Sequence, residues 1–242
     1  MFESQTTVGW GGSLLWLAGI AVASFLVSWL LTDRLGIGRI AYVGALALVA
    51  GCLTAGYIAW SGAGTAFWTN DWAWGIAGAL ITGAFLSFGV SRVPVARPGP
   101  GKVSAGAVLW DGVVYGAAEG LLLSVLPVVV MWQGFAGAGW THGWRGIPAG
   151  LVSLAASAVV IGVHHLGYRE FRGEGLRNMR FPVMGCSVLS LGYLVTASPI
   201  AAMGGHFILH AAMMIRGVEL PPHPIGEQQR QQLVPDARLR PA

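Results

Sequence analysis

Long apolar runs separated by short polar segments dominate the pattern of this chain. A helix that crosses a bilayer needs roughly 20 mainly apolar residues. The segments that meet this requirement are residues 13–31, 40–60, 72–90, 108–132, 147–166, 181–197 and 199–215. The pattern therefore predicts an all-α, polytopic membrane protein with seven transmembrane helices.

The last two predicted spans form one continuous run, residues 181–215, which contains no Lys, Arg, Asp or Glu and only two histidines. At about 1.5 Å per residue, this run is too long for a single crossing of a hydrocarbon core of about 30 Å. Proline disfavours helical geometry in the residue before it. The break is therefore expected at Ser198-Pro199, between two short antiparallel helices.

Basic residues alternate between the segments that connect the spans. Of the 14 Lys and Arg residues, all but Arg145 fall in alternate connecting segments. Cytoplasmic loops carry an excess of Lys and Arg, which predicts an external N-terminus and a cytoplasmic C-terminus. An even number of spans would destroy this alternation, so the charge pattern supports seven.

Composition agrees with a membrane protein, and we expect it to lie in a bacterial or archaeal plasma membrane. The chain is 55% hydrophobic and only 10% charged, whereas a soluble domain carries about 25% charged residues. Because the basic residues are dispersed, the predicted partner is the lipid bilayer and not nucleic acid. Residues 1–217 are expected to form the transmembrane domain. The Pro-, Gln- and Arg-containing residues 218–242 are expected to form a disordered cytoplasmic tail.

The fourth span carries a polar face. Asp111, Tyr115 and Glu119 follow one another at intervals of four and therefore lie along one side of a helix. Glu119 is expected roughly 16 Å inside the span by helical rise. An ionisable group at such a depth usually faces the protein interior or water and marks function.

Beside this face runs a row of small residues, Gly112, Gly116, Gly120 and Ser124. A small-xxx-small row lets a neighbouring helix approach closely, so we expect Glu119 to be enclosed by helices. Further along, Pro127 is expected to kink the span and to free backbone carbonyls.

Histidines provide the other ionisable groups within the apolar runs. His164 and His165 end the fifth span, and since adjacent helical residues point about 100° apart, at most one can face the interior squarely. His206 and His210 lie on one face of the seventh span, within reach of each other. Judged by depth, His165 and His210 are expected to approach Glu119 before His206 does.

These residues resemble the motifs of the CAAX prenyl protease and bacteriocin-processing (CPBP) family of membrane peptidases. That family has a Glu-rich motif, a Phe-xxx-His motif and a His-xxx-Asn/Asp motif on successive spans. The matching segments are Ala118-Glu119-Gly120, Ile161-Gly162-Val163-His164-His165-Leu166 and Gly205-His206-Phe207-Ile208-Leu209-His210. The similarity covers residues 115–215. Gly120 replaces the second Glu, Ile161 the aromatic residue, and His210 the Asn or Asp.

The resemblance implies an intramembrane glutamate-type endopeptidase. Glu119 and His165 would activate a water, and His206, with His210 in the Asn role, would stabilise the oxyanion. The family needs no metal cofactor, and its substrates would be membrane-associated peptides or proteins.

Three other classes stay open. Three histidines and a carboxylate could bind zinc in a membrane hydrolase similar to the alkaline ceramidases. A histidine of the fifth span, His164 or His165, could instead pair with His206 or His210 around a b-type haem. In a non-catalytic membrane scaffold, the same polar groups would only join helices.

Overall fold

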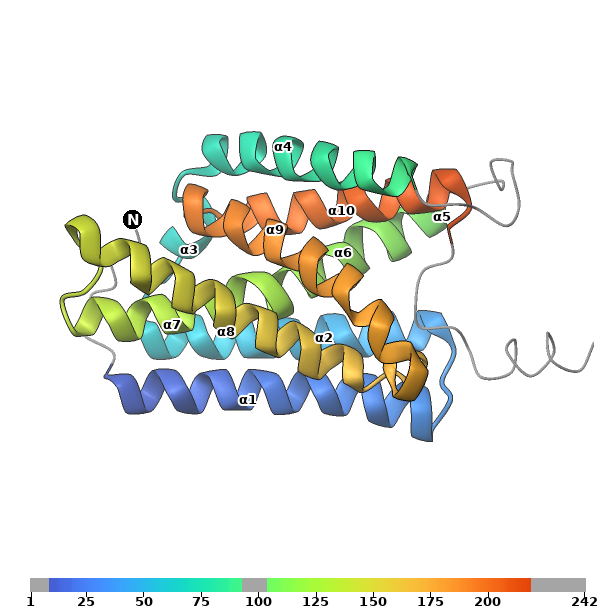
Figure 1. Ribbon diagram of the computed structural model, residues 1–242, viewed down its shortest axis with the longest axis horizontal. Coiled ribbons are helices and arrows are strands. Elements are labelled where there is room, and N and C mark those ends of the chain that lie inside the picture. The colour runs from blue at the N-terminus through green and yellow to red at the C-terminus, as the bar shows by residue number, and fades with distance from the viewer. Residues whose placement is uncertain (1–8, 93–103, 219–242) are drawn as a thin grey trace, which may run out of the picture.

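The computed structural model describes residues 9–92 and 104–218, and all regular secondary structure within these ranges is helical. The principal helices are α1 (Trp10–Ser28), α2 (Arg39–Ser61), α3 (Ala66–Thr69), α4 (Trp72–Ser91), α5 (Ala105–Ala107), α6 (Tyr115–Glu119), α7 (Leu126–Gly137), α8 (Gly146–Leu166), α9 (Arg180–Thr196) and α10 (Pro199–Arg216). They form one bundle, with α1 and α4 at opposite edges in the view of Figure 1. The tail predicted over residues 218–242 lies outside the described residues, except for Val218.

Six helical segments are long and apolar enough to cross a membrane. They are Trp10–Arg34, Arg39–Ser61, Trp72–Ser91, Ala105–Gly137, Gly143–Leu166 and Leu176–Thr196. The prediction of an all-α, multi-pass membrane protein is therefore confirmed. Helix α10 is not among the six, since its 18 residues include two histidines and Arg216.

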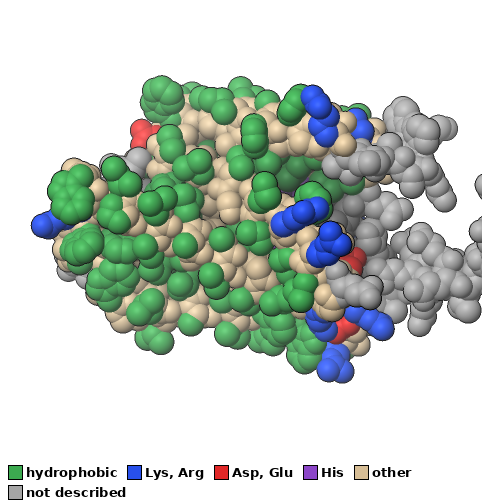
Figure 2. Space-filling model, in the orientation of Figure 1, with side chains coloured by type: hydrophobic (Ala, Val, Ile, Leu, Met, Phe, Trp, Pro, Cys, Tyr) green, Lys and Arg blue, Asp and Glu red, His purple; other side chains and the backbone are tan. Residues whose placement is uncertain are grey.

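Basic side chains gather mainly at one end of the bundle, and hydrophobic side chains cover the flank between the two ends (Figure 2). A lipid-facing surface requires such an apolar flank, because the bilayer core cannot solvate charged groups. We call the end that carries most of the arginines the arginine-rich end.

The long apolar run near the C-terminus is broken where the proline predicted it. Helix α9 ends at Thr196, and Ala197 adopts a left-handed conformation with φ of 56°. Ser198 is extended and Pro199 begins α10. Proline fits the first turn of a helix because its missing N–H has no intrahelical partner there.

The fourth predicted span is a continuous helical segment, Ala105–Gly137, and most of it is buried. Two π-helical stretches interrupt it, Val108–Val114 and Gly120–Val125. Pro127, close behind the second stretch, cannot donate to the carbonyl of Leu123. The Ser157 hydroxyl of α8 donates to that carbonyl at 2.7 Å, so the backbone group is satisfied inside the bundle.

The row of glycines on the fourth span faces α10. A Cβ atom placed on Gly116 would lie 2.9 Å from the backbone nitrogen of Phe207, and one on Gly120 would lie 2.9 Å from the Cα of Met203. The two backbones are therefore in direct contact, as the small-residue row predicted. This close approach brings the histidines of α10 to Glu119.

Candidate functional site

Glu119 ends α6 at the centre of the bundle, and only 4% of the residue is exposed. Three imidazole nitrogens surround its carboxylate. The Nε2 atoms of His206 and His210 lie 3.2 and 3.5 Å from Oε2, and Nε2 of His164 lies 3.7 Å from Oε1. We call these four residues, from α6, α8 and α10, the Glu119–histidine cluster.

Helix α10 presents its two histidines together. His206 and His210 are one turn apart, and their ring centroids are 4.7 Å apart. The predicted convergence of these two residues with Glu119 is therefore present in the structure. His206, which was expected to approach less closely than His210, is in fact the nearer of the two to the carboxylate.

The fifth span contributes His164, and not the expected His165, to the cluster. His165 bonds through Nδ1 to the carbonyl of Ile161 at 2.8 Å, and its ring packs against Phe171. Among the described residues, no ion pair joins His165 to Glu119. The structure therefore places His164, and not His165, in direct contact with the carboxylate of Glu119, because His164 is the residue of α8 that points toward it. The catalytic role of His165 stays a prediction.

Backbone carbonyls orient two of the three cluster histidines. Nδ1 of His164 lies 3.0 Å from the carbonyl of Ser24, and Nδ1 of His210 lies 2.9 Å from the carbonyl of Asp111. Because a carbonyl only accepts, each Nδ1 must carry the proton. In a neutral His210 ring, the Nε2 lone pair then points toward Glu119, whereas the Nε2 lone pair of His164 accepts from Tyr168. Nδ1 of His206 is buried and has no described protein partner, so its tautomer is not set in this way.

Two hydrogen-bonded tyrosines contact His164 through its Nε2 atom, opposite the Nδ1 atom that bonds to Ser24. The hydroxyl of Tyr168 lies 2.9 Å from Nε2 of His164 and also bonds to the hydroxyl of Tyr42 on α2. Burial raises the pKa of Tyr168, so its phenol stays protonated and donates to the imidazole. Neither tyrosine was singled out from the sequence, because a tyrosine near a helix end also suits the membrane interface.

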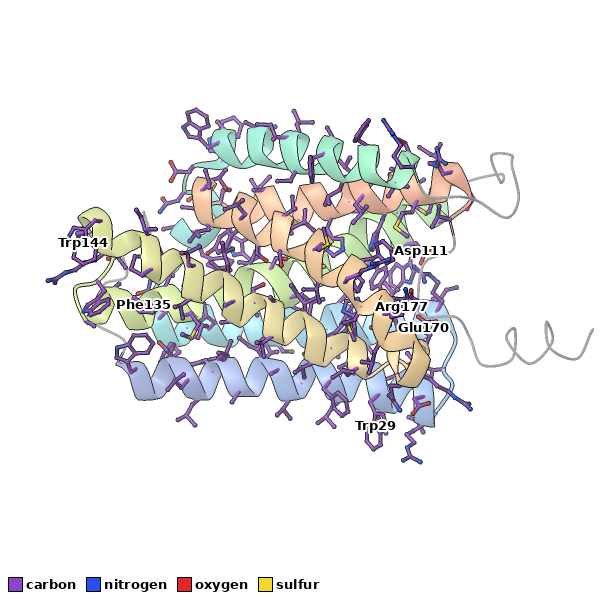
Figure 3. All side chains as sticks on the ribbon, in the orientation of Figure 1. Trp29, Asp111, Phe135, Trp144, Glu170 and Arg177 are labelled. Carbon is purple, nitrogen blue, oxygen red and sulfur yellow. The ribbon has the colours of Figure 1, made fainter. Side chains whose placement is uncertain are left out.

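Asp111 connects the cluster to the arginine-rich end. Its carboxylate pairs with Nε of Arg39 at 2.6 Å, while its carbonyl accepts from His210. The guanidinium of Arg39 also lies over the ring of Tyr115, 5.1 Å from the centroid. Figure 3 shows Asp111 at the same end of the bundle as Arg177. The two acidic residues on the predicted polar face of the fourth span therefore differ in role. Asp111 forms an ion pair near the end of the bundle, and Glu119 places a carboxylate in its interior.

The cluster has the composition of both an acid–base site and a metal site. A buried carboxylate beside imidazoles can take up and return a proton. The ligand atoms of Glu119, His206 and His210 also all lie within 4.8 Å of one another.

Comparison with known proteins identifies no relative of this chain. No family model matches it, and no curated protein or solved structure is significantly similar to it. The resemblance to the CPBP family therefore depends on the motif residues alone.

Proposed function

We propose that this protein is a membrane-embedded hydrolase of the glutamate type, an endopeptidase that cleaves membrane-associated peptides or proteins. The observation that carries the proposal is the buried carboxylate of Glu119, which three Nε2 atoms from two other helices surround at 3.2 to 3.7 Å. Separate segments converge here on one ionisable group, and an ionisable group inside a membrane protein is expensive to maintain without a role.

In this mechanism Glu119 is the general base. It takes a proton from water, and the resulting hydroxide adds to the carbonyl carbon of the scissile bond. His206 can adopt the tautomer with a proton on Nε2, because no carbonyl holds its Nδ1, and it then donates to the oxyanion. When the intermediate collapses, the C–N bond breaks and the amine leaves with the proton from Glu119. His164, held by Ser24 and Tyr168, keeps the carboxylate in place.

We further propose that α10 is the seventh span, with the N-terminus outside and the arginine-rich end in the cytoplasm. The alternation of basic residues along the chain supports this orientation. The connection from His210 through Asp111 to Arg39 leads from the cluster to that end. Peptide bonds would accordingly be cleaved in the cytoplasmic half of the membrane.

The geometry favours this proposal over the haem and scaffold alternatives. A haem held by two histidines requires imidazoles that face each other across the porphyrin plane, whereas here the imidazoles converge on one carboxylate. A scaffold needs hydrogen bonds between helices, but it does not need an acidic group at their centre. Replacement of Glu119 by its neutral isostere separates a scaffold from a hydrolase.

The test uses purified protein in liposomes with a panel of membrane-anchored fluorogenic peptides. Glu119→Gln keeps the side-chain shape but removes the base, and we expect a loss of about 10²–10⁴-fold in kcat. His142→Ala is the control, because it removes an exposed loop histidine outside the Glu119–histidine cluster, and we expect it to keep most of the activity. Cleavage by Glu119→Gln at the rate of the unmodified protein, or no cleavage of any peptide by the unmodified protein, would contradict the proposal.

A further inference from the structure

We infer that Glu119, His206 and His210 form a binding site for a divalent first-row transition ion, with zinc as the ion that fits best. When the ion is bound, Glu119 and His206 act as its ligands, and the ion takes the place of Glu119 in activating the water that attacks the substrate. Its catalytic role rests on the proposed function, whereas its binding does not.

The distances within the site match those of a zinc site. Tetrahedral zinc holds nitrogen and oxygen ligands at about 2.0–2.1 Å, which places neighbouring ligand atoms about 3.3–3.4 Å apart. Oε2 of Glu119 lies 3.2 Å from Nε2 of His206 and 3.5 Å from Nε2 of His210. Two edges of the tetrahedron are thus already present within about 0.2 Å.

The arrangement of protons is also compatible with a bound cation. Nδ1 of His210 donates to the carbonyl of Asp111, so the neutral ring directs a lone pair at the carboxylate oxygen. Two acceptors 3.5 Å apart repel each other unless a positive charge lies between them. Both contacts are satisfied either by one proton on each Nε2 or by a single metal ion that replaces these protons.

The surroundings of the ligands follow the usual pattern of metal sites. A histidine that binds a metal commonly donates its other nitrogen to a carbonyl or carboxylate, which fixes the ring, and the carbonyl of Asp111 does this for His210. The described ion pairs of Glu119 involve only histidines, so no fixed positive charge competes with the metal. His164 already accepts from Tyr168 through Nε2 and therefore stays outside the ligand set.

The ligand set is of the catalytic type. Two histidines and one carboxylate leave the fourth position of tetrahedral zinc for water, whereas structural zinc sites use four protein ligands. Zinc lowers the pKa of such a water to about 7 and polarises carbonyl groups. The site is therefore suited to hydrolysis of a peptide or ester bond.

The experiment measures metal binding directly. Purified full-length protein in detergent is stripped with a chelator, dialysed and titrated with Zn²⁺ by calorimetry. We expect one ion per chain. His206→Ala and His210→Ala should each weaken binding at least about 100-fold. His165→Ala and His142→Ala should bind as the unmodified protein does, because His165 pairs outside the ligand set and His142 is an exposed loop residue.

A spectroscopic measurement on the unmodified protein keeps the test independent of how the variants fold. Co²⁺ in a tetrahedral site gives intense visible d–d bands, and we expect these bands to disappear when Zn²⁺ is added. If the stripped protein takes up no Zn²⁺, shows no such bands, or binds equally tightly after both histidine substitutions, the metal site is wrong.

The metal site and the proposed function fail in different ways. Peptide cleavage at full rate in excess chelator, with no metal bound, would overturn the role of the ion and leave the glutamate mechanism. Stoichiometric zinc without cleavage of any peptide would support the site and contradict the endopeptidase function.

Discussion

Gly120→Ala tests whether close packing of the fourth span against α10 sets the geometry of the Glu119–histidine cluster. The added Cβ would lie 2.9 Å from the Cα and 3.0 Å from the backbone nitrogen of Met203. These are backbone atoms of a packed helix, so they cannot turn away as a flexible side chain would. The helix itself must move.

The size of the effect follows from these distances. Non-bonded carbon atoms are at their optimum about 3.5–4.0 Å apart, so α10 must retreat by roughly 0.6–1 Å. Overpacking of this kind costs about 1–3 kcal/mol of unfolding free energy. His206 lies less than one turn from Met203 and moves with it, which lengthens its 3.2 Å contact with Glu119. A misplacement of about 1 Å at a catalytic group lowers the rate by about 10²-fold.

Gly162→Ala is the matched control, because a Cβ on that glycine of α8 meets nothing within 4 Å. Alanine in an open helical position stabilises by up to about 1 kcal/mol relative to glycine in water. The free energy of unfolding in mixed micelles and the rate of peptide cleavage should therefore both fall for Gly120→Ala. For Gly162→Ala, both quantities should stay unchanged or rise. Equal behaviour of the two variants would show that the glycine row does not position the site.

Two further substitutions test the polar contacts around the cluster. Tyr168→Phe removes the hydroxyl that bonds His164 and Tyr42. The substitution should lower the free energy of unfolding in micelles by about 1–3 kcal/mol. It should also lower kcat, since His164 loses a contact that fixes its ring. An unchanged kcat would show that this tyrosine has no positioning role. Ser157→Ala leaves the carbonyl of Leu123 without the hydroxyl that bonds it at 2.7 Å and should destabilise by about 1–3 kcal/mol with little effect on kcat. A large kcat effect at unchanged stability would contradict a purely structural role for this serine.

Much of the fold could be predicted because it depends on properties of the local sequence. Apolar runs of membrane length indicate helices, since a single segment in lipid can pair its backbone groups within itself only as a helix. Pro199 marks the break between α9 and α10, because proline restricts the residue before it whatever its surroundings are. The glycines of the fourth span predicted a close helix contact, although they did not indicate that α10 is the partner.

The composition of the site required the tertiary structure. His164 and His165 are adjacent, and the rotation of α8 about its axis decides which of them meets Glu119. That rotation is set by packing and by partners far along the chain, such as the carbonyl of Ser24. The sequence alone therefore determined that this is a helical membrane protein with ionisable groups in its apolar spans. The packing of its helices decided which of these groups meet, because contacts between helices depend on surfaces that no single segment contains.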